Sequence, residues 1–288
     1  MKTKIFVCSS SSMDEIKHNE DIETIPFIYK FSDDEMFEDI NELTVDAVYN
    51  RLRFDKNSNV DILTNSYERV SQYLAKAKED GYDNAFFILP NRSIVNLDIP
   101  VKIAIEDNKN INAVMYQSNE ISIPLSYIAL YAYETLKNGS SLIDTWNELA
   151  NLESRSNIFI FTPSIKNERI NNFENVFKNG TYQIYKDGKL LKTPDVKKIN
   201  ALEVMLDELK DEISGKKIYP FILSSDKSSK YNEILYNALL EINDDINKNS
   251  FDKIRIFNLP IYFGIKCGIN SIAIGYIETK EGIIIEKK

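Results

Sequence analysis

The chain has 288 residues and a formal net charge of −9 at pH 7, with 43% hydrophobic and 27% charged residues. Such a chain forms one large globular domain or two ordinary ones. The acidic balance argues against a nucleic-acid-binding protein, which needs clustered lysine and arginine to contact phosphates. No run approaches the ~20 apolar residues needed to cross a membrane. The short apolar start is not a signal peptide, so we expect a cytoplasmic protein.

Side chains that carry chemistry are scarce in this sequence. It has one histidine, His18, in a polar stretch, and two cysteines, Cys8 and Cys267. These numbers argue against a histidine-based triad, a multi-histidine metal site and a disulfide framework. Neither a Gly-x-Gly-x-x-Gly string nor a Walker loop is present, so the usual cradles for nucleotide phosphates are missing. We therefore assign no catalytic residue, no metal ligand and no cofactor.

The first half of the chain alternates short apolar runs with helical patterns. We predict strands over residues 4–8, 24–30, 61–64, 84–89 and 111–116. We predict helices over residues 44–54, 65–79, 123–136 and 141–152, with Thr44 as the N-cap of the first. Strands that alternate with helices are typical of a mostly parallel α/β sheet with flanking helices.

The second half has a different pattern. We predict strands over residues 157–161, 217–223, 253–258, 271–278 and 282–286, and helices over residues 197–213 and 228–246. Residues 181–192 predict a hairpin, with Asp187-Gly188 as its two-residue turn. Hairpins mixed with crossovers indicate an α+β sheet. We place the domain boundary near residues 152–157, which gives an N-terminal α/β domain over 1–153 and a C-terminal α+β domain over 154–288.

The segment from Phe263 to Gly275 is the most informative stretch for function. It holds three of the nine glycines and places Lys266 and Cys267 just before a strand-like apolar run. Glycine, a small residue and a cation beside a strand can present backbone N–H groups and one positive charge to an anion. The sequence therefore favours an anion-binding role for this segment.

Several short strings, taken in order, carry a resemblance to a known family. They are Val7-Cys8-Ser9-Ser10-Ser11, Leu43 to Leu52, Leu63-Thr64-Asn65-Ser66, Asp80-Gly81-Tyr82-Asp83, Glu168-Arg169-Ile170, Lys186-Asp187-Gly188-Lys189 and the segment 263–275. They are similar to motifs of the DegV family, among them a strand followed by Thr-Asp-Ser-Thr, the turn Thr-Ser-Gln-Pro-Ser, the string Gly-Gly-Arg-Ile and a hairpin with Asp-Gly-Lys. The resemblance covers nearly the whole chain.

The sequence also departs from the family motifs at positions that concern the ligand. Ser9 stands where the family has the aspartate of Thr-Asp-Ser-Thr. The family's Ser-Gly-Thr, whose serine holds the lipid carboxylate, falls at Val95-Asn96-Leu97, where no hydroxyl is present. The family's His-Thr becomes Lys266-Cys267. These departures are compatible both with a changed head-group site and with the loss of that site.

The resemblance implies a two-domain protein with its ligand cleft between the domains. Members of the DegV family bind a fatty acid there, and some serve as the fatty-acid-binding subunit of a fatty acid kinase. We therefore expect a binding protein that holds a long-chain fatty acid in an interdomain tunnel and presents its carboxylate to a partner such as a kinase subunit. We expect Thr64 and Lys266 to share the head group, with Ser66, Ser10 and Asn96 as further ligands.

The resemblance also implies residues for the tail and for the partner. The tail would lie along the unusually apolar helix 123–136, at Ile123, Leu125, Tyr127 and Ile128. Arg169 would contact the partner protein. Each of these residues also has a purely structural interpretation: the apolar helix as core, Thr64 as a helix cap, Lys266 as a solvated cation and Arg169 in a surface ion pair.

Two other functions remain compatible with the sequence. In the first alternative, the chain is a degenerate DegV-like protein that has lost lipid binding and serves as an interaction or structural protein. The missing serine near Val95-Asn96-Leu97 favours this alternative. Second, an enzyme acting on a small anion would use Lys266 with Cys267, because a buried lysine can be tuned for chemistry.

Overall fold

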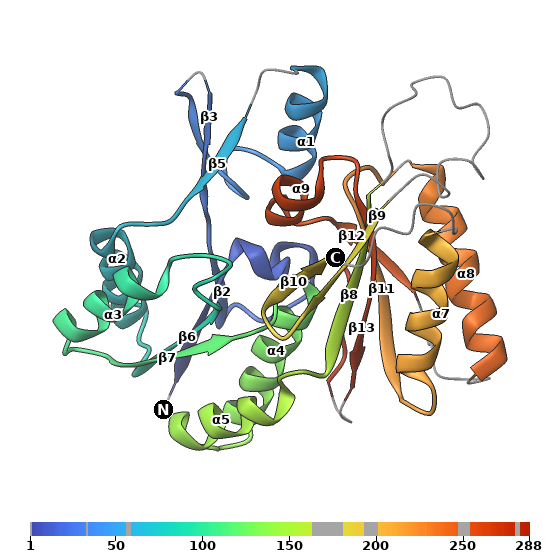
Figure 1. Cartoon of the computed structure of the whole chain (residues 1–288). Helices are drawn as coiled ribbons and strands as arrows, with labels where there is room; N and C mark the ends of the chain where they lie inside the picture. The colour runs from blue at the N-terminus through green and yellow to red at the C-terminus, as the bar shows by residue number, and fades with distance from the viewer. Residues whose placement is uncertain are drawn as a thin grey trace. The chain divides into compact units, whose positions relative to one another are not determined.

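The computed structural model describes residues 2–32, 34–55, 59–162, 181–192, 201–227, 229–246, 254–279 and 283–288. The chain divides into two compact units (Figure 1). The first unit comprises Met1–Ser154 and Glu281–Lys288, and the second comprises Arg155–Lys280. Arg169, the predicted partner contact, lies outside the described residues.

A four-stranded parallel sheet forms the centre of the first unit. Its strands are β1 (Thr3–Cys8), β2 (Ile22–Ile25), β6 (Asn84–Pro90) and β7 (Asn112–Ser118). They lie in the order β2-β1-β6-β7 and every neighbouring pair is parallel. Every residue of β6 is buried, as is typical of a parallel strand covered on both faces. The predicted α/β class with a parallel sheet is therefore confirmed.

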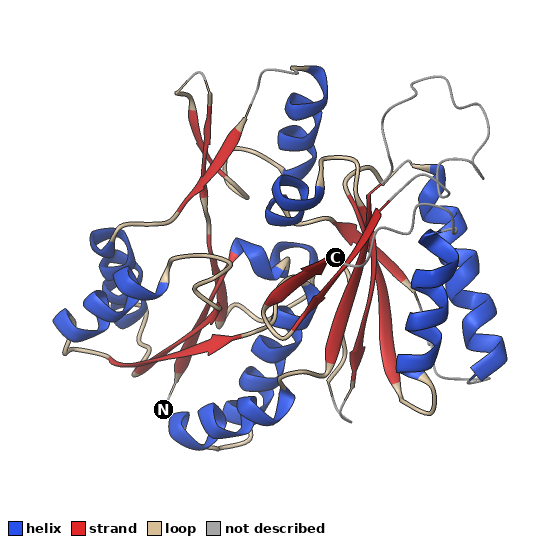
Figure 2. Ribbon diagram, in the orientation of Figure 1, coloured by secondary structure: helices blue, strands red, loops and turns tan. Residues whose placement is uncertain are grey.

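Helices cover this sheet (Figure 2). They are α2 (Tyr67–Glu79), α3 (Asp98–Asp107), α4 (Ile123–Lys137) and α5 (Leu142–Leu149). Helix α4 packs on β1 and β6 and against α5, whereas α2 packs against α3. Phe6 of β1 stacks on Phe87 of β6 and meets Tyr73 of α2 edge-on. Phe6 of β1 thus lies on the face of the sheet that α2 covers.

A second, smaller sheet belongs to the first unit. Its antiparallel strands β3 (Ile28–Phe31), β4 (Met36–Glu38) and β5 (Val60–Leu63) lie in the order β4-β3-β5, and α1 (Val45–Phe54) follows β4. The predicted strand 24–30 is wrong in its continuity, because β2 and β3 belong to different sheets. Pro26 lies between them, and proline has no N–H to offer to a sheet ladder.

The second unit contains a mixed sheet of six strands. They are β8 (Ser156–Thr162), β9 (Thr181–Lys186), β10 (Lys189–Lys192), β11 (Ile218–Ser224), β12 (Arg255–Asn258) and β13 (Ile272–Glu278), in the order β10-β9-β8-β13-β11-β12. Only the β11–β12 pair is parallel among these described strands. Met205 and Leu209 of α7 (Ala201–Ile213) and Leu235 and Leu239 of α8 (Lys230–Ile246) join the sheet in one apolar core. The predicted mixed α+β sheet and its hairpin are confirmed.

Two parts of the chain fold differently from the prediction. Residues 261–267 form a short helix that the sequence analysis did not predict, α9 (Ile261–Cys267), and Lys266 lies in its last turn. Residues 283–286 do not form the predicted closing strand beside β13. Instead, Lys287 forms an antiparallel bridge with Ile16, and the Lys288 N–H donates to the Glu15 carbonyl at 2.9 Å, both within the first unit.

Candidate functional site

The carboxyl ends of β1, β6 and β7 lie at one edge of the parallel sheet. β1 has β2 on one side and β6 on the other, so the strand order reverses at the β1–β6 pair. In open α/β sheets, ligands bind beyond the carboxyl ends of the strands at such a switch point. The loops that follow these three strands therefore define the candidate site.

Hydrogen bonds tie these loops together. The Ser122 N–H, in the loop after β7, donates to the Ser10 carbonyl after β1 at 2.6 Å. The Ser12 and Ser122 hydroxyls lie 3.1 Å apart, and the Ser126 hydroxyl donates to the Ser11 carbonyl at 2.5 Å. We call Ser10, Ser11, Ser12, Ser122 and Ser126 the serine clasp, since they join the start of α4 to the end of β1.

Ser122 of the serine clasp has a strained backbone. Its φ is 59° and its ψ is −138°, a combination that normally requires glycine. The residue is fully buried. Its N–H and hydroxyl both bond to the loop after β1, so the surrounding contacts hold the conformation in place. Strain of this kind costs ~1–3 kcal/mol and concentrates at functional sites.

The loop after β5 and the loop after β1 both form hydrogen bonds with the segment around Pro26, which follows β2. The Asn65 side-chain N–H donates to the Pro26 carbonyl at 2.5 Å, and the Ser9 hydroxyl lies 3.3 Å from the neighbouring Ile25 carbonyl. Ser66 caps α2, because its hydroxyl accepts from the Arg69 N–H at 3.4 Å. Thr64 is half-buried. The cap of the following helix is thus Ser66 and not Thr64.

Asp39 joins β1 to the smaller sheet. It is 2% exposed, and one carboxylate oxygen accepts from the Ser9 hydroxyl at 2.7 Å and from the Phe27 N–H at 2.8 Å. The other oxygen accepts from the Tyr29 hydroxyl at 3.0 Å. Burial nevertheless raises the pKa of Asp39 to about 6. The sequence analysis did not identify Asp39. Its carboxylate lies beside Ser9, the residue that stands at the aspartate position of the DegV motif Thr-Asp-Ser-Thr.

The loop after β6 is ordered by Asn91. Its side-chain oxygen accepts from the Ser93 N–H at 2.9 Å, and its side-chain nitrogen donates to the Asn119 oxygen at 3.0 Å, in the loop after β7. Asn96 is exposed in this loop. Of the predicted head-group residues, the structure therefore brings Ser10 and Asn96 to the carboxyl edge of the sheet, with Thr64 and Ser66 after β5.

The predicted tail residues are part of the core. Ile123, Leu125, Tyr127 and Ile128 are each at most 2% exposed. Helix α4 is apolar on nearly all sides, as is typical of a helix buried within a domain. Their role as tail lining stays a prediction, and it requires these side chains to move apart when a ligand enters.

The Ser10 side chain is buried and its hydroxyl already has a partner within the protein. It is 4% exposed, and its hydroxyl lies 3.0 Å from the Cys8 sulfur. Burial raises the pKa of the Cys8 thiol to about 12. Ser10 therefore acts on the site mainly through its carbonyl, which holds the Ser122 N–H.

In the second unit, Lys266 is exposed in the last turn of α9. The neighbouring Cys267 is half-buried, and burial raises the pKa of its thiol to about 11. The Cys267 carbonyl accepts from the Thr162 hydroxyl at 3.0 Å. A thiol with such a pKa is protonated at neutral pH and is a weak nucleophile, which disfavours the enzyme that uses Lys266 with Cys267.

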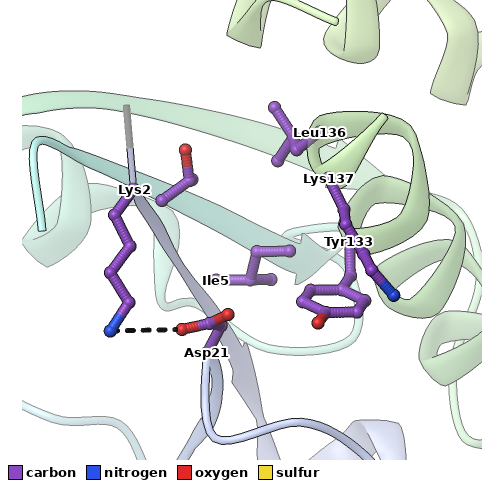
Figure 3. A pocket seen from close by; sticks show the side chains of 7 residues that line it. Lys2, Ile5, Asp21, Tyr133, Leu136 and Lys137 are labelled. Atoms are coloured by element: carbon purple, nitrogen blue, oxygen red, sulfur yellow. Dashed lines mark ion pairs between the residues drawn. The ribbon is translucent and has the colours of Figure 1, made fainter. Parts of the chain in front are cut away.

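A small pocket lies at the opposite, amino edge of the parallel sheet (Figure 3). Its volume is about 160 Å³, and it is lined by Lys2, Thr3, Ile5, Asp21, Tyr133, Leu136 and Lys137. The Lys2 ammonium and the Asp21 carboxylate, which both line it, are 3.7 Å apart. None of the predicted site residues lines this pocket.

Two negative findings concern the described residues alone. In the described ranges, no three His, Cys, Asp or Glu side chains come together in a way that could hold a metal ion. No described helix is long and apolar enough to cross a lipid bilayer.

The sequence matches the family model described as "Uncharacterised protein, DegV family COG1307" over residues 2–169, which is more than half of the chain. The chain belongs to the DegV family. No curated protein matches it. The predicted family is thereby confirmed.

Solved structures of this family have the same fold. A protein of Thermotoga maritima, reported to reveal a fatty-acid-binding function, has a TM-score of 0.74 at 18% identity, covering 97% of this chain and 100% of its own. A fatty-acid-binding DegV family protein of Streptococcus agalactiae has a TM-score of 0.75 at 16% identity, with the same coverage. DegV of Bacillus subtilis, also described as a fatty acid binding protein, has a TM-score of 0.73 at 15% identity, again with that coverage.

Proposed function

We propose that this DegV family protein binds a long-chain fatty acid and presents the carboxylate to a partner such as a kinase subunit, without catalysing a reaction itself. The observation that carries the proposal is the meeting of polar loops at the carboxyl edge of the parallel sheet, directly beside the apolar helix α4. A fatty acid needs both features. Its tail gains ~0.8 kcal/mol for each buried CH₂, and its carboxylate needs hydrogen-bond donors.

Relatives support the class of ligand. Solved structures with the same fold include fatty-acid-binding proteins of several bacteria, among them a stearic-acid-binding protein of Eubacterium ventriosum. We infer that the tail of this chain's ligand lies along α4. The interdomain tunnel, the contact of Arg169 with a partner and the cytoplasmic location stay predictions.

Among the predicted head-group residues, Thr64 and Asn96 are the best placed to donate. Thr64 is half-buried and Asn96 is exposed, whereas the Ser66 hydroxyl is already engaged as a helix cap and the Ser10 hydroxyl lies against Cys8. Lys266 has an exposed side chain and would add a positive charge. A charge-assisted hydrogen bond is about twice as strong as a neutral one.

Native mass spectrometry of the purified protein, followed by solvent extraction, tests the proposal. We expect a co-purified long-chain fatty acid, or uptake of added stearic acid with one molecule bound per chain. An apo mass together with no uptake of stearic acid would contradict lipid binding.

Lys266→Ala tests the predicted role of that residue. Because the side chain is exposed, we expect the fold to be intact and the bound fatty acid to decrease, as measured by the extracted amount per chain. Lys137→Ala, another exposed lysine, is the matched control and should leave occupancy unchanged. Equal occupancy in Lys266→Ala and the unsubstituted protein would remove Lys266 from the site.

A specific observation favours the degenerate, non-binding alternative. The loop after β6 has no hydroxyl at Val95-Asn96-Leu97, and Val95 and Leu97 are buried in the core. If no fatty acid co-purifies and no added stearic acid is taken up, the protein is an interaction protein, and the next step is to identify its protein partner.

A further inference from the structure

The chain leaves the first unit beside the loop that follows β7. The first unit reaches Ser154, and the second begins at Arg155. Glu153, just before this crossing, accepts from the Asn119 backbone N–H at 2.9 Å and from the Tyr116 hydroxyl at 2.8 Å. Asn119 lies in the loop after β7, and Tyr116 lies on β7 itself. One side chain therefore attaches the connection between the units to the carboxyl edge of the parallel sheet.

Each oxygen of the Glu153 carboxylate has its own donor. Oε1 accepts from Tyr116, and Oε2 accepts from Asn119. Hydrogen bonds to an ionised acceptor are about twice as strong as neutral ones. Burial, together with the charge of Glu153, raises the pKa of Tyr116, so the phenol keeps its proton and remains a donor. The Tyr116 ring also meets Trp146 edge-on, with the ring centroids 5.6 Å apart, which limits its movement.

The connection between the units is short. The Arg155 carbonyl accepts from the Glu278 N–H at 2.8 Å within the second unit, and β8 follows directly. Only Ser154 therefore lies between a residue bonded to the first sheet and a residue bonded within the second unit. The φ of Ser154 is 61°, in the left-handed region that residues other than glycine seldom adopt. A movement of Glu153 thus reaches Arg155 through a single intervening residue.

The loop after β7 is also part of the candidate site. The Asn119 side chain accepts from the Asn91 side chain in the loop after β6 at 3.0 Å. Ser122, at the end of the same loop, donates its N–H to the Ser10 carbonyl after β1 at 2.6 Å. Three loops of the carboxyl edge are therefore joined through the loop that Glu153 holds. A ligand that orders these loops also favours the Glu153 contacts, because the loss of conformational freedom then occurs only once.

We propose that Glu153 is a positioning residue that couples ligand binding at the carboxyl edge to the connection between the two units. The inference rests on the proposed fatty-acid binding and adds a conformational response to it. With the ligand bound, the loop after β7 is ordered, Glu153 keeps both donors, and residues 153–155 are restrained. Without the ligand, the loop opens more often and releases the connection. Such coupling is reciprocal, so loss of the Glu153 contacts must also weaken ligand binding.

Hydrogen–deuterium exchange of the full chain, with and without saturating stearic acid, tests this inference. In the unsubstituted protein we expect stearic acid to slow exchange over residues 150–156. Glu153→Ala should abolish that slowing and weaken stearic acid binding by about threefold to tenfold, as for a lost hydrogen bond. Glu153→Gln keeps one accepting oxygen without the charge and should lose part of both effects. It provides the same test if the alanine variant does not fold.

Glu148→Ala is the matched control, because Glu148 is also a half-buried glutamate that accepts from a tyrosine hydroxyl, that of Tyr131 at 2.9 Å. It should leave the affinity and the ligand-dependent slowing unchanged. A purely structural Glu153 would let Glu153→Ala speed exchange equally with and without stearic acid, which would overturn the inference. Stearic acid that binds the unsubstituted protein without slowing exchange over residues 150–156 would overturn it as well. Failure of the unsubstituted protein to bind stearic acid is a different outcome, and it would remove the proposed function together with this inference.

Discussion

The two edges of the parallel sheet in the first unit are built on different principles. At the amino edge, charges are paired: Lys4 contacts Glu23 at 2.9 Å, and Lys2 contacts Asp21 at 3.7 Å. Both ammonium groups also lie over the ring of Tyr82, whose hydroxyl donates to Asp21 at 2.8 Å. At the carboxyl edge, hydroxyls, amides and the buried Asp39 carboxylate hold the loops together, and the backbone is strained at Ser122.

This difference separates stability from function along the same strands. The amino edge satisfies its own charges, which leaves little for a ligand to gain. The carboxyl edge contains Ser122, a buried residue in a strained conformation. Open α/β sheets bind ligands beyond the carboxyl ends of their strands, where the strand order reverses. The distribution of polar groups in this sheet agrees with that rule.

The largest effect is expected from breaking the serine clasp. Ser122→Val places a β-branched residue at φ 59° and ψ −138° and removes the hydroxyl that meets Ser12. We expect the free energy of unfolding to fall by ~3 kcal/mol or more in urea titrations, from added strain and a lost hydrogen bond.

Ser122→Gly is the matched control for this prediction. Glycine adopts the backbone conformation without strain, and its loss of the hydroxyl is thereby partly offset. We expect a change in unfolding free energy of less than ~1 kcal/mol. If the valine and glycine variants were equally stable, the strain assigned to Ser122 would be wrong.

The second largest effect is a pH dependence of the unfolding free energy that is caused by Asp39. Burial raises its pKa from 3.8 to about 6, so the folded state holds this proton more tightly than the unfolded chain does. The stabilising contribution is complete below pH ~4 and is lost as the pH rises through about 6. The unfolding free energy should therefore gain ~2–3 kcal/mol from this group between pH 7 and pH 4.

Asp39→Asn cannot titrate and isolates this contribution. It retains one oxygen to accept from the Phe27 N–H or the Ser9 hydroxyl. We expect the difference in stability between the unsubstituted protein and Asp39→Asn to change with pH in that window, in parallel urea titrations. A difference that stays constant from pH 4 to pH 7 would contradict a raised pKa for Asp39.

The smallest effect is expected at the amino edge. The Lys2 side chain is 49% exposed, and its ion pair with Asp21 is partly open to solvent. Lys2→Ala should lower the unfolding free energy by ~1 kcal/mol or less and leave lipid binding unchanged. A loss of fatty acid in this variant would move the ligand to the pocket of Figure 3 and reverse the comparison between the edges.

Local patterns were sufficient to predict most of the fold. The apolar runs of β1, β6 and β13 and the Thr44 cap of α1 are local features, and the structure reproduces them. Helix α3 was not predicted; Pro100 lies in its first turn, where proline is tolerated. Helix α9 was not predicted either, since its seven residues include Gly264 and glycine is a poor helix former.

The candidate site was less accessible to prediction, because its contacts join distant parts of the chain. Asp39 bonds to Ser9 across thirty positions, and Ser122, in the loop after β7, bonds to Ser10, which follows β1. Neither pair has a sequence pattern that would reveal it. The strain at Ser122 is likewise invisible in the sequence, since serine is ordinary at most positions and only its backbone angles distinguish it.

The return of residues 283–288 to the first unit makes the second unit an insertion. Backbone bonds from Lys17 to Glu286 and from Lys288 to Glu15 attach this segment to the loop between β1 and β2. The first unit therefore cannot complete its contacts until residues 283–288 have been synthesised, whereas the second unit is already whole. During translation the domain that begins first is finished last, and a chaperone or protease would meet it with one of its surfaces still uncovered.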